Sequence, residues 1–186
     1  MGYVFDPEEL YRISKLGVGK PFDEMVRGVV DELVRVYPSH VEPDPKWVYS
    51  LAGGATGIMG ILHGSLSEYL IIFGSPIGTE GFSGRYFIDI HDFVLAGEMW
   101  TYTESRYSER VITKPGERAL LRRGDVKGFR ISEECWMLEY GLGPVPTSLP
   151  MALGDALFSG QDLNTIAKTL WVYGRLVLRE LLRGKI

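Results

Sequence analysis

The sequence predicts an α+β fold, in which helices at both ends of the chain flank a central run of strands. Residues 1–38 and 146–183 carry apolar side chains at the three- and four-residue spacing of amphipathic helices. Residues 65–141 instead hold short segments rich in aromatic and β-branched residues. About seven such strands with no helical interval predict a closed sheet or a sandwich.

Helix signals dominate the first 38 residues. Asp6 can cap a helix whose first position is Pro7, and Gly17 breaks that helix. A second helix follows Pro21 and stops before Pro38, because the residue preceding a proline is held away from the helical conformation.

Residues 50–61 contain four glycines in an apolar run, which leaves their secondary structure unassigned. The glycines favour close backbone packing. A phosphate-binding loop is the alternative, although the Lys-Ser/Thr pair that ends such a loop is missing.

The predicted strands are bounded by turn sequences such as Pro115-Gly116 and Arg123-Gly124-Asp125. They cover residues 69–73, 85–95, 100–103, 109–113, 119–122, 127–131 and 136–140.

Two helices are predicted after the strands, over residues 146–160 and 162–183. In the second, one side is apolar and the other basic. The apolar stripe consists of Leu163, Ile166, Leu170, Tyr173, Val177 and Leu181, and the basic side of Lys168, Arg175, Arg179 and Arg183. Residues 163–186 carry a net charge of +4, whereas the rest of the chain carries −8. Such a helix suits an anionic membrane surface, or it packs on the sheet with a solvated basic face.

Composition limits the function classes. The 186 residues suffice for one domain with a sizeable core, and the net charge of −4 argues against a nucleic-acid partner. Cys135 is the only cysteine, which favours a reducing compartment. Neither a secretory signal nor a run of about 18 apolar residues occurs, so we expect a cytoplasmic, peripherally membrane-associated protein without a transmembrane span.

Six short motifs are the most informative part of the chain. They are Leu51-Ala52-Gly53-Gly54, LHGSLSEYL (62–70), GTEG (78–81), SGRY (83–86), WMLEYG (136–141) and LGDALFSGQD (153–162). In this order and spacing, they resemble the sterol delta-isomerases of ergosterol synthesis and the non-opioid sigma receptor of animals, which form one small family.

The resemblance covers residues 20–180 and implies a cupin-like β-barrel whose mouth is covered by two C-terminal amphipathic helices. It also implies a homo-oligomer, with a trimer favoured. We therefore divide one domain, residues 1–186, into a helical N-terminal part (1–62), a β-barrel (63–143) and a C-terminal helix pair (144–186). The sigma receptor has an N-terminal membrane span for which this sequence shows no counterpart.

Glu139 is the first candidate catalytic residue. It lies in an otherwise apolar strand, where period-2 alternation places it on the face of Met137 and opposite Trp136. Such a carboxylate is either exposed at a sheet edge or buried for a purpose, and burial favours its neutral, proton-donating form. By resemblance, Glu139 corresponds to the residue that holds the cationic amine of sigma-receptor ligands.

Asp92 is the second candidate, since the resemblance aligns it with the receptor's other pocket acid. Alternation places Asp92 on the apolar face with Ile90, whereas Asp89 and His91 share the opposite face. A purely structural role, in which Asp92 accepts backbone hydrogen bonds, is the alternative.

Two carboxyl groups in an apolar cavity tend to share one proton. Such a pair can protonate one carbon of an alkene and remove a proton from a neighbouring carbon, which moves the double bond. Together with the resemblance, this chemistry implies isomerisation of a sterol or a related polycyclic or isoprenoid lipid as the expected function. A non-catalytic binding protein for lipophilic amines or sterols is the second hypothesis, and a scaffold that acts through its oligomer is the third.

The resemblance also implies a wall of substrate-binding residues around this pair. They are Met59, Ile61, Tyr69, Ile71, Phe73, Tyr86, Ile90, Trp136, Leu149, Ala152 and Tyr173. Phe82 stands where the family usually has histidine, and Ala55 and Gly64 also depart from the receptor, which leaves the identity of the substrate open.

No cofactor and no metal are expected. His40, His63 and His91 lack the closely spaced His-x-His and carboxylate pattern of a cupin metal site. His63 is interpreted as a hydrogen-bonded structural residue. Signatures of serine and cysteine hydrolases are missing as well.

Overall fold

The computed structural model describes residues 2–185 and confirms the α+β class. The helices are α1 (Pro7–Ser14), α2 (Phe22–Val36), α3 (Leu149–Phe158) and α4 (Leu163–Leu182), with short 3₁₀ turns at Lys15–Gly17, Glu104–Arg106 and Val145–Ser148. The strands are β1 (Lys46–Ala52), β2 (Ala55–Gly64), β3 (Glu68–Ser75), β4 (Thr79–Phe82), β5 (Asp89–Tyr102), β6 (Val111–Thr113), β7 (Arg118–Leu121) and β8 (Gly128–Leu142). Asp6 caps α1 as predicted, accepting a hydrogen bond from the Glu8 backbone N–H.

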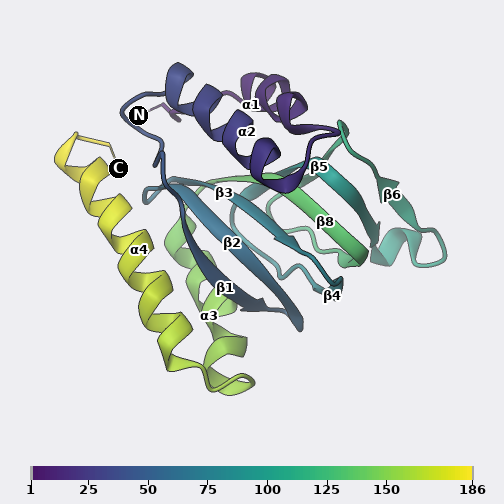
Figure 1. Ribbon diagram of the computed structural model, residues 1–186. Helices are drawn as coiled ribbons and strands as arrows, with labels where there is room; N and C mark the ends of the chain where they lie inside the picture. The colour runs from purple at the N-terminus through teal and green to yellow at the C-terminus, as the bar shows by residue number, and fades with distance from the viewer. Residues whose placement is uncertain (1, 186) are drawn as a thin grey trace.

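All strands form one antiparallel sheet in the order β1-β2-β3-β8-β5-β6, with β4 paired to β8 and β7 paired to β5. The longest strands, β5 and β8, pair with each other near the middle of the sheet. The sheet is strongly curved and returns on itself at β4 (Figure 1). There the Phe82 backbone N–H donates to the Gly53 carbonyl at 2.8 Å, so that β4 meets the turn between β1 and β2.

Helices cover both faces of this sheet. In Figure 1, α1 and α2 lie above it and α3 and α4 lie on its other side. Strand alternation sends one set of side chains toward α1 and α2, where they form the main core with the buried faces of both helices. This core includes Leu62, Leu70, Ile72, Phe93, Leu138 and Tyr140 from the strands and Leu10, Ile13, Val29 and Leu33 from the helices. The other set faces α3 and α4.

The predicted helical N-terminal part, residues 1–62, is wrong beyond Val36, because residues 46–52 and 55–64 are strands. Glycines make this hairpin possible. Gly53 and Gly54 form its turn with φ of 61° and 84°, which side-chain-bearing residues rarely adopt. A Cβ atom on Gly57 would lie 2.7 Å from the Phe73 ring, so this strand packs closely only with glycine there. The structure therefore confirms the predicted close backbone packing and shows that these residues form a strand hairpin.

Two further predicted boundaries differ from the structure. The predicted segments 127–131 and 136–140 fall on one strand, β8, apart from residue 127, and the segments 85–95 and 100–103 belong largely to β5. Register shifts in β5 near Gly97 let the two long strands stay paired despite their irregular sequence. A Cβ atom on Gly97 would lie 1.7 Å from the Glu134 carbonyl oxygen.

Helix α4 spans the predicted range, and Asp162 caps it by accepting a hydrogen bond from Thr165. Its packing face differs from the predicted apolar stripe. The buried residues are Thr165, Thr169, Val172, Leu176 and Glu180. Members of the stripe such as Leu163, Leu170 and Leu181 are exposed.

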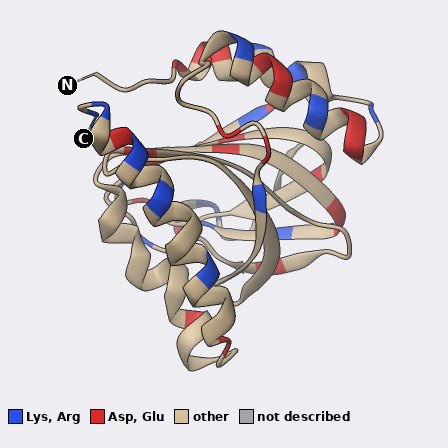
Figure 2. Ribbon diagram, turned by 60° about the vertical axis from the view of Figure 1, so that its left-hand side comes forward, with Lys and Arg blue, Asp and Glu red and all other residues tan. Residues whose placement is uncertain are grey.

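Ion pairs explain why α4 is turned this way. Figure 2 shows basic residues along α4. The Arg175 guanidinium lies 2.7 Å from Glu42, Arg179 lies 3.5 Å from the same carboxylate, and the buried Glu180 lies 2.7 Å from His40. The basic side thus packs against the segment after α2, and the apolar residues turn outward.

The buried carboxylate of Glu68 binds residues near both ends of the chain. Glu68 accepts hydrogen bonds from the Val4 backbone N–H at 2.8 Å and the Tyr140 hydroxyl at 2.7 Å, and the Lys185 ammonium lies 2.8 Å away. Burial alone would raise the pKa of Glu68, but the hydrogen bonds from Lys185, Val4 and Tyr140 lower the pKa below its ordinary value.

Replacing this carboxylate is expected to destabilise the fold in a pH-dependent way. Because the folded-state pKa of Glu68 is lowered, its contribution is present above the unfolded-state pKa and is lost as pH falls through the folded-state pKa. We expect Glu68→Gln to cost about 3 kcal/mol of unfolding free energy at pH 7, and the difference from the wild type to shrink below about pH 4. Urea unfolding followed by circular dichroism measures both quantities.

The exposed Glu133 on the same strand, β8, as Tyr140 supplies the control. Glu133→Gln should unfold at the wild-type urea concentration at both pH values. Equal stability of Glu68→Gln and Glu133→Gln at pH 7 would contradict the role given to the Glu68 cluster.

Candidate active site

A cavity of about 200 Å³ lies between the curved sheet and the helices α3 and α4. Its wall is mostly apolar and comes from β1, β2, β3, β4, β5, β7, β8 and both helices. The structure places ten of the eleven residues predicted for the pocket wall on this cavity, namely Met59, Ile61, Tyr69, Ile71, Phe73, Tyr86, Ile90, Leu149, Ala152 and Tyr173. Strand alternation therefore brings together residues that lie far apart in the sequence.

Trp136 is the predicted wall residue that faces elsewhere. Its ring packs 4.4 Å from the Phe22 ring and 6.2 Å from the Trp47 ring, on the face covered by α2. The reason is strand alternation, because Glu139 lies three positions after Trp136 on one strand and side chains an odd number of positions apart face opposite sides. The same alternation rule that placed Glu139 in the cavity excludes Trp136 from it.

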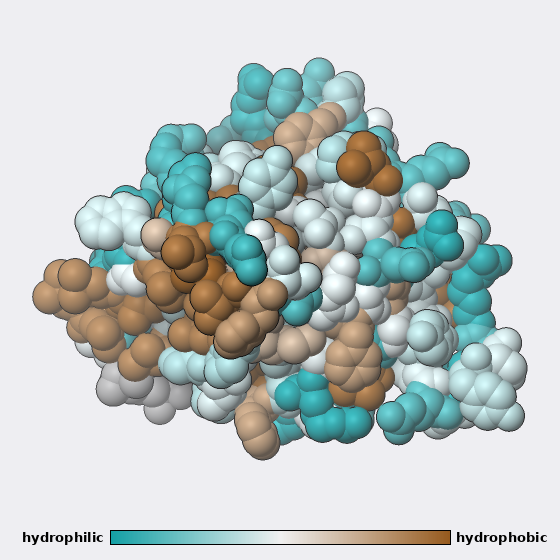
Figure 3. Space-filling view, turned by 90° about the horizontal axis from the view of Figure 1, so that it is seen from below, coloured by the Kyte–Doolittle hydropathy of each residue, from teal (hydrophilic) through white to brown (hydrophobic). Residues whose placement is uncertain are grey.

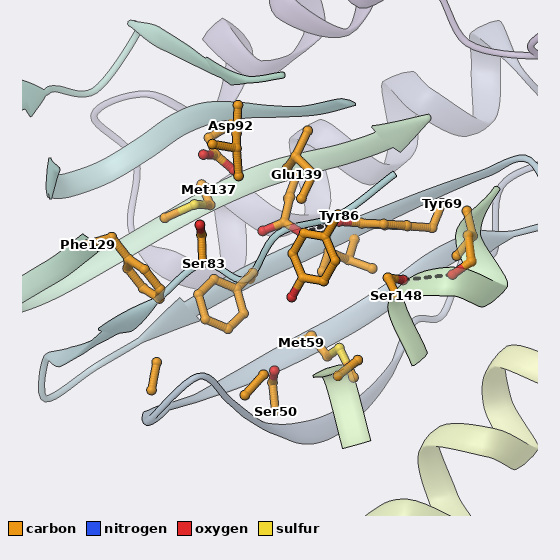
Figure 4. Close-up of a pocket in the computed structure, with 18 of the residues that line it drawn as sticks. Ser50, Met59, Tyr69, Ser83, Tyr86, Asp92, Phe129, Met137, Glu139 and Ser148 are labelled. Carbon is orange, nitrogen blue, oxygen red and sulfur yellow. Dashed lines mark hydrogen bonds between the residues drawn. The ribbon is translucent and has the colours of Figure 1, made fainter. Parts of the chain in front are cut away.

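Glu139 and Asp92 lie directly opposite each other on β8 and β5. Cross-strand partners have Cβ atoms about 4.5–5.5 Å apart and point to the same face of the sheet. Both side chains line the cavity, as Figure 4 shows. The Tyr69 hydroxyl donates a hydrogen bond of 2.7 Å to Glu139 Oε1. The pairing thus builds a carboxyl pair into an apolar wall.

Lys127 completes this group and was missed at the level of sequence. Its Nζ lies 2.5 Å from Asp92 Oδ2, and its side chain is 13% exposed against 3% for Asp92. Nothing in the local sequence separates Lys127 from a surface lysine, because its partner is 35 positions away. Only the pairing of β5 with β8 brings the ammonium to the carboxylate.

The environment of Glu139 favours its protonated form. Burial raises the pKa of Glu139 to about 7, and the charge of Asp92 adds to the rise, whereas the Tyr69 hydrogen bond and the Lys127 charge oppose it. The remaining titratable neighbour is Tyr86, whose pKa is raised to about 12 by burial and by Glu139. Near neutral pH, the site can therefore hold one exchangeable proton on a carboxyl group.

A second group of ligand-type side chains lies outside the cavity. His40, His63 and Glu180 offer donor atoms within 4.8 Å of one another. His63 donates through Nδ1 to the His40 carbonyl at 2.8 Å, as a structural histidine would, and burial lowers its pKa. The Glu180 carboxylate already meets the guanidinium groups of Arg183 at 3.2 Å and Arg179 at 3.6 Å. These two positive charges oppose the binding of a further cation at this cluster. The cluster instead connects α4 with the segment after α2.

Comparison with known proteins agrees with the motifs. The family model described as ERG2 and Sigma1 receptor like protein matches residues 1–185. The chain belongs to this family. A C-8 sterol isomerase ERG2 from Gibberella zeae is 39% identical over 99% of the chain and 79% of that protein. A sigma non-opioid intracellular receptor 1 from Xenopus tropicalis is 36% identical over 96% of the chain and 81% of the receptor.

Solved structures show only a loose likeness. A cupin superfamily protein from Desulfitobacterium hafniense is 16% identical, with a TM-score of 0.40 over 53% of this chain and 79% of that protein. The relatives compared above include both a protein named as an isomerase and one named as a receptor. Which of the two functions this chain has must be argued from its site.

Proposed function

We propose that the protein is an isomerase that moves a carbon–carbon double bond in a sterol or a related polycyclic or isoprenoid lipid. The observation that carries this proposal is the carboxyl pair of Asp92 and Glu139, set opposite each other in an apolar cavity. A Gibberella zeae relative named as a C-8 sterol isomerase supports it.

The reaction needs only one proton in and one proton out. Glu139 donates its proton to one alkene carbon, and the neighbouring carbon becomes a carbocation. A carboxylate of the pair then removes a proton from the adjacent carbon, and the electrons of that C–H bond form the new double bond. Atoms and electrons balance without a redox change, and no cofactor is assigned a role.

The cavity wall supports the cationic intermediate. The Glu139 carboxylate left after donation lies in a low-dielectric site, where its attraction for the cation is strong. Aromatic faces of Phe73 and Tyr86 also line the cavity and attract cations. The walls keep water away, which would otherwise capture the carbocation.

Entry of such a lipid requires movement of the cover. The cavity of about 200 Å³ is smaller than the range of about 300–1,000 Å³ usual for ligand sites. Asp155 of α3 accepts a hydrogen bond of 2.6 Å from the Gly54 backbone N–H at the turn between β1 and β2. We assign to α3 the role of a lid that this hydrogen bond fastens.

The orientation of the lipid follows from Thr169 of α4. Its side-chain oxygen is buried beside the cavity and has no hydrogen-bond partner within residues 2–185. An unsatisfied buried hydroxyl costs about 1–3 kcal/mol, which a hydroxyl group of the ligand would recover. The substrate therefore carries a hydroxyl at α4 and its double bond beside Asp92 and Glu139.

The outer surface of α3 and α4 is the proposed membrane contact. No helix within the described residues is both long and apolar enough to cross a bilayer. Exposed apolar side chains nevertheless gather over these helices, at the left of Figure 3. They are Leu157, Phe158, Leu163, Leu170, Trp171, Leu178, Leu181 and Leu182. Since Arg175, Arg179 and Arg183 are engaged in ion pairs, attachment rests more on apolar insertion than on charge.

A homo-oligomer, with a trimer favoured, stays a prediction from the family resemblance. The exposed aromatic side chains Phe82, Tyr102 and Tyr107 lie around a second hollow in the surface and offer a contact area for it.

Turnover by a carboxyl pair, rather than binding alone, is tested by isotope exchange. Incubation with an unsaturated sterol in deuterated water should yield an isomer that carries deuterium. We expect Glu139→Gln to lower this rate by about 10²–10⁴-fold, because the amide cannot donate and recover the proton, and Asp92→Asn to lower it as well. Since the pKa of Glu139 is raised to about 7, turnover should decline as pH rises through 7 and its protonated form is lost.

The exposed Glu133→Gln variant serves as the control and should keep the wild-type rate. Full activity of Glu139→Gln would refute the assignment. Tight binding of the sterol without any deuterium label in the wild type would instead favour the second function, a binding protein like the Xenopus receptor.

The orientation is tested with Thr169→Val, which keeps the shape of the side chain and removes its hydroxyl. Affinity for a 3-hydroxysterol should fall about tenfold, the effect of one lost hydrogen bond. Affinity for the 3-deoxy analogue should stay within twofold of the wild type in the same calorimetric titration. Equal losses for both sterols would show that Thr169 does not meet the hydroxyl.

The membrane contact is tested by flotation with phosphatidylcholine vesicles that contain phosphatidylserine. Replacing Trp171 and Leu178 by glutamine should reduce binding about a hundredfold, given about 1.5 kcal/mol or more for each inserted side chain. High salt should weaken wild-type binding only slightly. Ile77→Gln is the control, because Ile77 is 88% exposed on a loop away from α4. Release of the wild type by salt alone would show that charge dominates.

A further inference from the structure

Lys127 is the only cation among the described residues that line the cavity. It stands just before β8 and directs its ammonium to Asp92, at 2.5 Å. Such a pair is unexpected in a pocket for an uncharged lipid, because the cost of removing both charges from water can exceed the gain from their attraction. The ion pair therefore calls for a functional reason.

The lysine is built into the wall and is not a chance contact. The Lys127 backbone N–H donates to Ser83 Oγ at 2.9 Å, and the Ser83 backbone N–H donates to the Lys127 carbonyl, also at 2.9 Å. These reciprocal bonds hold the start of β8 against the segment after β4. Met99 Sδ lies 4.0 Å from Nζ and adds a soft contact. The stem is thereby aimed into the cavity.

Two equivalent carboxyl groups would share a proton, and either of them could donate it. The ammonium removes this equivalence, because it contacts Asp92, whereas Glu139 meets the uncharged Tyr69 hydroxyl. We propose that Lys127 is a positioning residue that keeps Asp92 as the permanent anion and leaves Glu139 as the group that carries the exchangeable proton. This inference rests on the proposed isomerase function and adds the division of roles within its site.

The net charge of the cavity also determines whether it favours a neutral or a cationic ligand. At rest, the Lys127 ammonium, the Asp92 carboxylate and a protonated Glu139 sum to zero, which suits a neutral lipid. When Glu139 donates its proton, the carbocation and the new carboxylate also sum to zero. Charge is thus balanced before and after each proton transfer, and only the position of the proton changes.

Without Lys127, the resting cavity would carry a charge of −1 and would select cations. A ligand ammonium would then neutralise the single negative charge of the carboxyl pair, as the Lys127 ammonium now does. Lys127 therefore distinguishes a site for neutral alkenes from a site for lipophilic amines. In this chain, the lysine competes with any amine for the same carboxylate.

The experiment compares N,N-dimethyldodecylamine with its uncharged analogue N,N-dimethyldodecanamide by calorimetry at pH 7. Lys127→Met, which keeps the length of the stem and removes the charge, should bind the amine about tenfold more tightly than the wild type does. Its affinity for the amide should change less than twofold. The double variant Lys127→Met/Asp92→Asn restores a neutral cavity and should return the amine to wild-type affinity or weaker.

A second readout follows the proton on Glu139 by carbon NMR of labelled glutamate. Loss of the Lys127 charge should move the Glu139 titration to higher pH, and Lys127→Arg should leave it near the wild-type position. Turnover of an unsaturated sterol should fall in Lys127→Met and be largely kept in Lys127→Arg.

The outcomes separate the two proposals. An unchanged ratio of amine to amide affinity in Lys127→Met, together with an unchanged Glu139 titration, overturns the role of Lys127. A wild type that never turns over sterol overturns the isomerase function, yet the affinity ratio and the titration still decide whether Lys127 sets the charge of the cavity. If Lys127→Met does not fold, Lys127→Gln is measured in its place against the same two thresholds.

Discussion

The pairing of β5 with β8 is the constraint on which the rest of the structure depends. In this register, Asp92 lies opposite Glu139, and the next pair, Phe93 and Leu138, points to the opposite face. A slip of β8 by one residue would send Glu139 into the core beneath α1 and α2 and bring Leu138 to the cavity in its place. The bulge at Gly97 absorbs the irregularity of β5 beyond the site and so protects this register.

Much of this arrangement could be predicted from the sequence, because alternation along a strand is a local property. Alternation correctly placed Ile90 and Asp92 on the same face of their strand, and Glu139 and Met137 on the same face of theirs. The pairing of the two strands then brings both faces to the cavity. The resemblance added most of the remaining wall. Trp136 shows the limit of transfer by resemblance, since strand parity contradicts its place in the wall and the structure follows parity.

The elements that escaped prediction depend on contacts between distant residues. Strand β2 is glycine-rich because the Trp47 and Phe73 rings lie against Gly60 and Gly57, and neither neighbour is visible locally. The packing face of α4 is likewise decided by Glu42, which comes from another part of the chain. Helical periodicity identified two chemically different sides of α4 but could not say which neighbour each side would meet.

A low dielectric gives the carboxyl pair its chemical value and also creates its main difficulty. Two adjacent acids in an apolar cavity resist ionisation together, so one keeps a proton near neutral pH. The same cavity would hold an excess negative charge poorly and would admit any lipophilic cation that neutralised it. Lys127 resolves both problems, because it stabilises one carboxylate permanently and occupies the position of a competing cation. In this chain, the charge that a ligand meets in the cavity thus depends on a residue whose ammonium is paired with one acid of the carboxyl pair.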